Sequence, residues 1–128
     1  MGGTPLSLRP VADWTDLTDG AGLRPGGVTG VEIGGRELVV WRDRQGRPCV
    51  MDARCPHQWS HLPSEGVVDG AELVCTAHFW RFGRDGAGWK LAVTGRRDRK
   101  GDVEVYPCRE AGGRIEAQLP GATAEAGP

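Results

Sequence analysis

Two short motifs of cysteine and histidine lie near the middle of this chain. The first is Cys55-Pro56-His57, and the second, Cys75-Thr76-Ala77-His78, begins after seventeen intervening residues. Thiolate sulfur and neutral imidazole nitrogen are soft to borderline donors, so two of each suit zinc or an iron–sulfur centre. The sequence therefore predicts a metal site formed by Cys55, His57, Cys75 and His78.

The distribution of these residues helps to separate the two kinds of site. A zinc finger usually takes two cysteines from one loop and two histidines from a helix. Here each motif contributes one cysteine and one histidine. That arrangement suits a two-iron cluster in which one iron binds two thiolates and the other binds two imidazoles. Ligand type and number alone fit both kinds of site, so a structural zinc ion remains the alternative.

The stretch CPHQWSHLPSEGVVDGAELVCTAHFWRFGRDG, residues 55–86, resembles the Rieske [2Fe–2S] domain in both ligand loops and in the hairpin between them. A weaker resemblance extends from Leu6 to Leu119. It implies a Rieske-type [2Fe–2S] cluster, with the two cysteines on the inner iron and the two histidines on the outer iron. We expect a flexible N-terminus at 1–5, a Rieske domain at 6–119 and a disordered tail at 120–128.

Four positions bear on which kind of Rieske domain this is. High-potential Rieske proteins typically have a second cysteine in each ligand loop, joined as a disulfide, and a serine and a tyrosine that bond the cluster sulfurs. The matching positions here are Ser60, Ala77, Trp80 and Phe82. Fewer hydrogen bonds to sulfur lower the reduction potential. The chain therefore resembles the low-potential type, which comprises Rieske ferredoxins and the Rieske domains of aromatic-ring and steroid oxygenases.

Within that type, the segments GRELVVWRD and HFWRFGRDG resemble the N-terminal domain of a Rieske oxygenase. Such oxygenases also have a domain that binds a mononuclear iron through two histidines and a carboxylate. No histidine follows His78 in these 128 residues, so we expect the chain alone to move electrons and not to activate oxygen.

The expected function is that of a one-electron transfer protein, the ferredoxin-like component of an oxygenase system. The resemblance implies a flavin-dependent reductase as electron donor and an oxygenase as acceptor. One alternative is a Rieske subunit stably bound to a separately encoded catalytic subunit. Others are a redox-sensing or structural cluster module, and a subunit without a cluster, although the intact ligand set argues against the last.

Charge and hydropathy narrow the possible partners. The chain has 16 basic and 17 acidic residues and a net charge of −1, so it lacks the basic footprint of a nucleic-acid or anionic-membrane binder. The start, MGGTPLSLRP, has no charged segment followed by an apolar run, as a secretory signal would. No window is apolar for long enough to span a bilayer. We expect a soluble cytoplasmic protein of one domain.

The remaining pattern predicts an all-β fold, a small antiparallel barrel or sandwich with the two cluster-binding loops at one tip. Gly-Gly and Asp-Gly pairs at 34–35 and 69–70 predict hairpin turns, and Trp14–Leu17 is interpreted as a turn or a single helical turn. Runs of apolar residues, several of them alternating with polar ones, predict strands at 8–12, 28–33, 37–41, 49–52, 67–68, 72–74, 80–82, 89–93, 103–105 and 115–119.

Other residues have more than one interpretation. Cys49 and Cys108 lie in strand-like runs and are expected to be buried free thiols. Trp59 could cap the core, shield the cluster or contact a partner. His61 could form local hydrogen bonds, or act in docking or proton transfer. The basic run Gly95–Gly101 could be a solvated hairpin tip or a surface that attracts an acidic redox partner.

Overall fold

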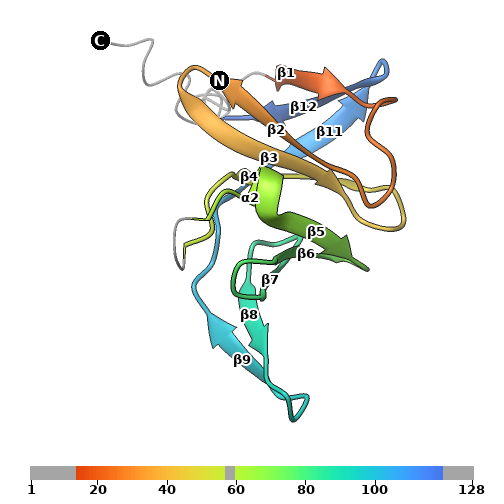
Figure 1. Ribbon diagram of the computed structural model, residues 1–128. Coiled ribbons are helices and arrows are strands. Elements are labelled where there is room, and N and C mark those ends of the chain that lie inside the picture. The colour runs from red at the N-terminus through yellow and green to blue at the C-terminus, as the bar shows by residue number, and fades with distance from the viewer. Residues whose placement is uncertain (1–13, 57–59, 120–128) are drawn as a thin grey trace, which may run out of the picture.

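The computed structural model describes residues 14–56 and 60–119. Its strands form three sheets in which all neighbouring strands are antiparallel (Figure 1). The predicted strand at 8–12, the two chain ends, His57 and Trp59 lie outside the described residues. Among the residues described, no helix has both the length and the apolar character needed to cross a bilayer.

The strands follow a simple order within each sheet. The first sheet consists of β1 (Trp14–Asp19), β12 (Arg114–Gln118) and β11 (Cys108–Ala111). The second consists of β10 (Val105–Tyr106), β4 (Pro48–Asp52), β3 (Arg36–Arg42) and β2 (Val28–Ile33). The third consists of β5 (Gly66–Asp69), β6 (Glu72–Cys75), β7 (Trp80–Gly83), β8 (Gly88–Leu91) and β9 (Arg97–Lys100). A single turn of helix, α2 (Leu62–Glu65), precedes β5.

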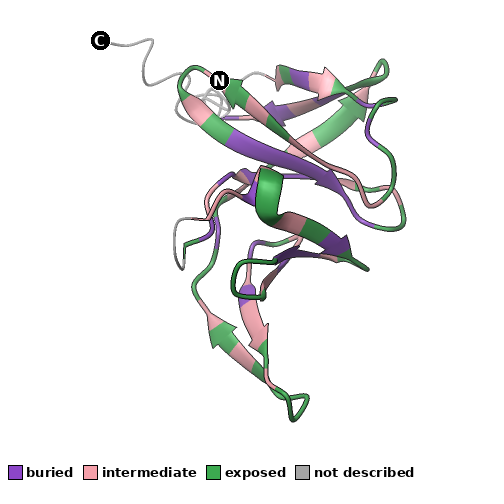
Figure 2. Cartoon of the chain, viewed as in Figure 1, coloured by how far each residue is buried: buried purple, intermediate pink, exposed green. Residues whose placement is uncertain are grey.

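The second sheet lies between the other two, and its middle strands β3 and β4 are largely buried (Figures 1 and 2). Strand β3 explains why: all its residues from Leu38 to Arg42 are buried, so it lacks the apolar–polar alternation of a half-exposed strand. Because side chains alternate across a strand, Val39 and Trp41 enter one core and Leu38 and Val40 enter the other.

The two cores hold the three layers together. The core between the first and second sheets contains Leu17, Leu23, Leu38, Val40, Val50, Tyr106, Ile115, Ala117 and Leu119. The core between the second and third sheets contains Val39, Trp41, Cys49, Met51, Cys55, Leu62, Val68, Leu73, Cys75, Phe82 and Val103. The prediction of a small all-β antiparallel fold is confirmed in its layered form; the described strands do not close into a barrel.

Several predicted strands and turns are confirmed. Gly34 and Gly35 join β2 to β3 with φ angles of 57° and 82°, the left-handed pair that a two-residue hairpin turn needs. The hairpin between the two ligand motifs is also present, as β5 and β6. The predicted strand at 103–105 is shorter than expected, because only Val105 and Tyr106 pair with β4.

One prediction was wrong, and another was correct only in part. Trp14–Leu17 is not a turn but most of strand β1, because it pairs with β12 and buries Leu17 in the core. The hairpin-tip interpretation of the basic run holds in part: Gly95 and Arg96 lie in the turn that joins β8 to β9, whereas Arg97–Lys100 form β9 at the edge of the third sheet. At Trp14–Leu17, long-range pairing outweighed local turn-forming residues.

The backbone of Gly88 packs closely against the backbone of Gly101. A Cβ atom added at Gly88 would lie 2.0 Å from the carbonyl oxygen of Gly101, which directly follows the neighbouring strand β9. We expect Gly88→Ala to lower the free energy of unfolding by about 1–3 kcal/mol, the usual cost of overpacking. Urea unfolding measures this, and Gly22→Ala is the control, because its nearest contact would be 3.6 Å away. Equal stability of the two variants would contradict this account of the packing.

Candidate metal centre

The two motif cysteines lie in the same core. Cys55 comes shortly after β4, Cys75 is the last residue of β6, and each is 1% exposed. Both belong to the core between the second and third sheets, and neither forms a disulfide. The thiols are thus held away from water, as the sulfur ligands of the inner side of a metal site would be.

The second ligand loop places its histidine, His78, at the protein surface. Thr76, Ala77, His78 and Phe79 form an exposed turn between β6 and β7. His57, the fourth predicted ligand, lies outside the described residues. Within 14–56 and 60–119, no three cysteine, histidine or acidic side chains are gathered so that they could hold a metal ion. The described donors fit a cluster with sulfur inside and imidazole outside, and the complete ligand set stays a prediction.

Two contacts bring the loops to one end of the molecule. A Cβ atom at Gly101 would lie 3.8 Å both from Pro56 in the first loop and from the Trp80 ring, just after the second. Thr76 is tied to the helix that follows the first loop: its N–H and its hydroxyl donate to the Glu65 carbonyl at 2.9 and 2.7 Å. The short helix α2 therefore couples one loop to the other.

The first loop is closed at its base by backbone hydrogen bonds. Arg54 and His61 form an isolated antiparallel bridge. The Cys55 N–H donates to the Ser60 carbonyl at 2.9 Å, and the Leu62 N–H donates to the Ala53 carbonyl at 2.7 Å. These bonds define the neck of the loop, residues 53–55 and 60–62, and fix the direction in which Cys55 enters the core.

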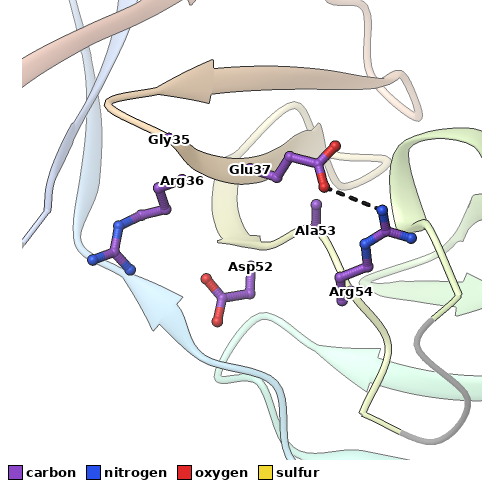
Figure 3. A pocket seen from close by; sticks show the side chains of 6 residues that line it. All are labelled: Gly35, Arg36, Glu37, Asp52, Ala53 and Arg54. Carbon is purple, nitrogen blue, oxygen red and sulfur yellow. Dashed lines mark ion pairs between the residues drawn. The ribbon is translucent and has the colours of Figure 1, made fainter.

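Glu37 of β3 clamps this neck with its carboxylate. Its Oε1 lies 3.3 Å from Arg54 Nη2, a pair that Figure 3 shows, and its Oε2 lies 3.2 Å from His61 Nε2. The other ring nitrogen of His61 lies 3.0 Å from Ser64 Oγ. The local hydrogen-bonding interpretation of His61 is therefore confirmed. The sequence did not identify Glu37, because its partners are 17 and 24 residues away.

A groove of about 370 Å³, lined in part by charged side chains, lies beside this neck. Figure 3 shows its lining side chains, among them Arg36, Asp52 and Arg54. The Tyr106 hydroxyl donates to Asp52 Oδ1 at 2.6 Å and accepts from Arg36 Nη1 at 3.0 Å. Burial, together with the bond to the Asp52 carboxylate, raises the pKa of Tyr106 to about 12. The neutral phenol thus holds β10 against β4 just before the first loop.

The second loop contains the one described non-glycine residue with a positive φ angle. Phe79 has a φ of 61° and is 61% exposed. A left-handed conformation costs an L-residue about 1–2 kcal/mol. The Phe79 N–H donates to the Cys75 carbonyl at 2.6 Å, and Lys90 Nζ donates to the His78 carbonyl at 2.9 Å. Neither Phe79 nor Lys90 was identified from the sequence, since backbone angles and pairing across β7 and β8 are visible only in the structure.

The other two cysteines take no part in this arrangement. Cys49 is buried and Cys108 is half-buried, and neither is in a disulfide, so the prediction of free thiols is confirmed. Burial raises the pKa of Cys49 to about 12 and also raises that of Cys108. Because the thiolate is the reactive and metal-binding form, these thiols are poor ligands at neutral pH.

The basic run is largely neutralised. Arg96, Arg97 and Arg99 form ion pairs with Asp98, Glu72 and Asp102. The guanidinium groups of Arg97 and Arg99 also lie over the ring of Trp89, 5.3 and 5.2 Å from its centre. These contacts explain the basic run as part of the surface of the third sheet. That it attracts an acidic redox partner stays a prediction.

The clamp predicts a change in the mobility of the first loop. We expect Glu37→Ala to speed hydrogen–deuterium exchange of the segment at 53–62 by about two- to tenfold, because the partly exposed ion pair with Arg54 and the hydrogen bond with His61 are lost. Mass spectrometry of the full chain measures this rate. Glu32→Ala is the matched control, since Glu32 lies opposite Glu37 on β2. If both variants exchange at the wild-type rate, Glu37 does not stabilise the neck.

Comparison with known proteins identifies the family to which this fold belongs. The profile of the Rieske [2Fe-2S] domain matches residues 13–109. Among curated proteins, the oxygenase component of 3-ketosteroid-9-alpha-monooxygenase from Mycobacterium tuberculosis is 40% identical over 72% of this chain and 23% of its own length. Cholesterol 7-desaturase from Ciona intestinalis is 33% identical over 76% of the chain and 21% of its own length. The chain thus spans about a fifth of the length of these relatives.

Solved structures show the same fold. The ferredoxin of carbazole 1,9a-dioxygenase from Nocardioides aromaticivorans IC177 has a TM-score of 0.68 at 24% identity, with 84% of this chain and 98% of the ferredoxin covered. NdmA of Pseudomonas putida CBB5 has a TM-score of 0.73 at 23% identity, with 87% of this chain and 35% of NdmA covered. The family match extends over well more than half of the residues. The chain belongs to the Rieske [2Fe-2S] domain family, whose cofactor is a [2Fe–2S] cluster.

Proposed function

We propose that this chain is a one-electron transfer protein whose cluster is held by Cys55, His57, Cys75 and His78. The observation that carries the proposal is the placement of the two motif thiols in one core beside an exposed turn that contains His78. When bound, a [2Fe–2S] cluster supplies a site that takes up and releases one electron. The buried cysteines exclude water from the inner side, and His78, in the exposed turn, offers a route to the surface.

The electron would pass from a flavin-dependent reductase to an oxygenase. Two kinds of similarity support the oxygenase: curated relatives are named as oxygenase components, and one structural neighbour is a complex of oxygenase and ferredoxin in carbazole 1,9a-dioxygenase. The reductase rests on the family resemblance alone. The segment at 6–119 would form the electron-transfer domain.

A second arrangement is favoured by one observation, the identity of 40% to an oxygenase component that is several times longer. The chain would then be the Rieske part of an oxygenase whose catalytic part is encoded separately. Co-expression with that oxygenase separates the two possibilities. A carrier elutes alone from a size-exclusion column, because transient redox contacts are small, whereas a subunit elutes with its partner.

The ligand assignment predicts the effect of removing one buried thiol. Cys75→Ser should lose the Rieske EPR signal of the dithionite-reduced protein and most of its iron and acid-labile sulfide. Cys49→Ala, which removes another thiol from the same core, should keep all three. A native signal in Cys75→Ser would refute the assignment, and loss of the signal in Cys49→Ala would point to general disruption of the core.

The electron-transfer role predicts a reversible one-electron titration. Because the hydroxyl donors expected of the high-potential type are replaced by Trp80 and Phe82, the midpoint potential should lie well below about +100 mV. Spectroelectrochemistry of the purified full chain gives both the number of electrons and the potential. A two-electron wave, or a midpoint above that value, would contradict the proposed type.

A further inference from the structure

The peptide group between His78 and Phe79 is held at both of its polar atoms. Its carbonyl accepts from Lys90 Nζ at 2.9 Å, and its N–H donates to the Cys75 carbonyl at 2.6 Å. Lys90 belongs to β8 and lies opposite Trp80 of β7. The backbone that leaves His78 is thus fixed by the strand beside it and by the residue that ends β6.

The backbone angle of Phe79 indicates that these bonds work against a local preference. A bulky residue with a φ of 61° is a genuine outlier, and it persists only where its surroundings hold it. The ring itself is 61% exposed, so burial of the side chain does not account for this conformation. The two hydrogen bonds to the preceding peptide group hold the backbone on the N-terminal side of Phe79.

Lys90 brings a charge as well as a hydrogen bond. Asp98 lies opposite Lys90 in the register between β8 and β9, but its Oδ1 accepts from Arg96 Nε at 2.9 Å. The ammonium group of Lys90 instead reaches the backbone of His78. Reduction of the cluster adds one electron and makes or breaks no bond, so the reduced site carries one more negative charge. A cation nearby favours that state.

We propose that Lys90 is a positioning residue for the outer side of the cluster. It orients His78 through the carbonyl of that residue, and its ammonium group raises the reduction potential. The inference rests on the proposed function, because it takes His78 as a ligand. Lys90, a β8 residue outside both ligand motifs, thus helps to set the geometry and the reduction potential of the site.

The test compares Lys90→Met with Lys90→Arg in the cluster-loaded full chain. Arg114→Gln is the charge-matched control, because Arg114 lies in the first sheet, across the central sheet from Lys90, and pairs with Asp16 (Figure 1). We expect Lys90→Met to lower the midpoint potential by more than the control does, and by less at high salt, where charges are screened. Lys90→Arg should recover most of the shift. Lys90→Gln is a second variant with the same expected direction.

A second measurement tests the hydrogen bond. Hydrogen–deuterium exchange of the segment at 76–79 should be faster in Lys90→Met than in wild type and unchanged in Arg114→Gln. The proposal is overturned if Lys90→Met shifts the potential no further than the control, or if exchange of this segment is unchanged. A wild-type chain without a cluster would instead refute the proposed function, and the exchange comparison would still test the contact between Lys90 and His78.

Discussion

Burial of the middle strands of the central sheet, β3 and β4, on both faces is the constraint on which the rest of this structure depends. Strand β3 contributes side chains to both cores, and β4 beside it leads directly into the first ligand loop. A strand packed on both sides has little freedom to shift, because a one-residue slip would exchange its two faces. The position of Cys55 is thus set by the packing of β3 and β4, before any metal contributes.

The second loop is positioned in a different way. Cys75 ends β6 within the core between the second and third sheets, and the chain then turns through four exposed residues before β7 begins. Such a turn has few apolar contacts of its own. Its direction depends on hydrogen bonds from Thr76 to α2 and from Lys90 to His78. The loop with the buried ligand is fixed by packing, whereas the exposed ligand is fixed by polar contacts.

The sequence predicted the parts of this arrangement that are local in the chain. The motif spacing identified the two ligand loops, and Gly34-Gly35 and the apolar runs located the main hairpins. It failed where distant pairing decides the outcome. Trp14–Leu17 carries turn-like residues but becomes β1 because β12 is there to pair with it. Glu37 and Lys90 resemble ordinary surface charges until the neighbouring strands bring His61 and His78 to them.

The central claim is that two buried thiols and an exposed imidazole loop hold a pair of irons. Quantitation of iron, zinc and acid-labile sulfide in anaerobically purified full chain tests this most directly. The account predicts two irons and two sulfides per chain and a Rieske EPR signal on reduction. A colourless protein with one zinc ion per chain and no labile sulfide would contradict it.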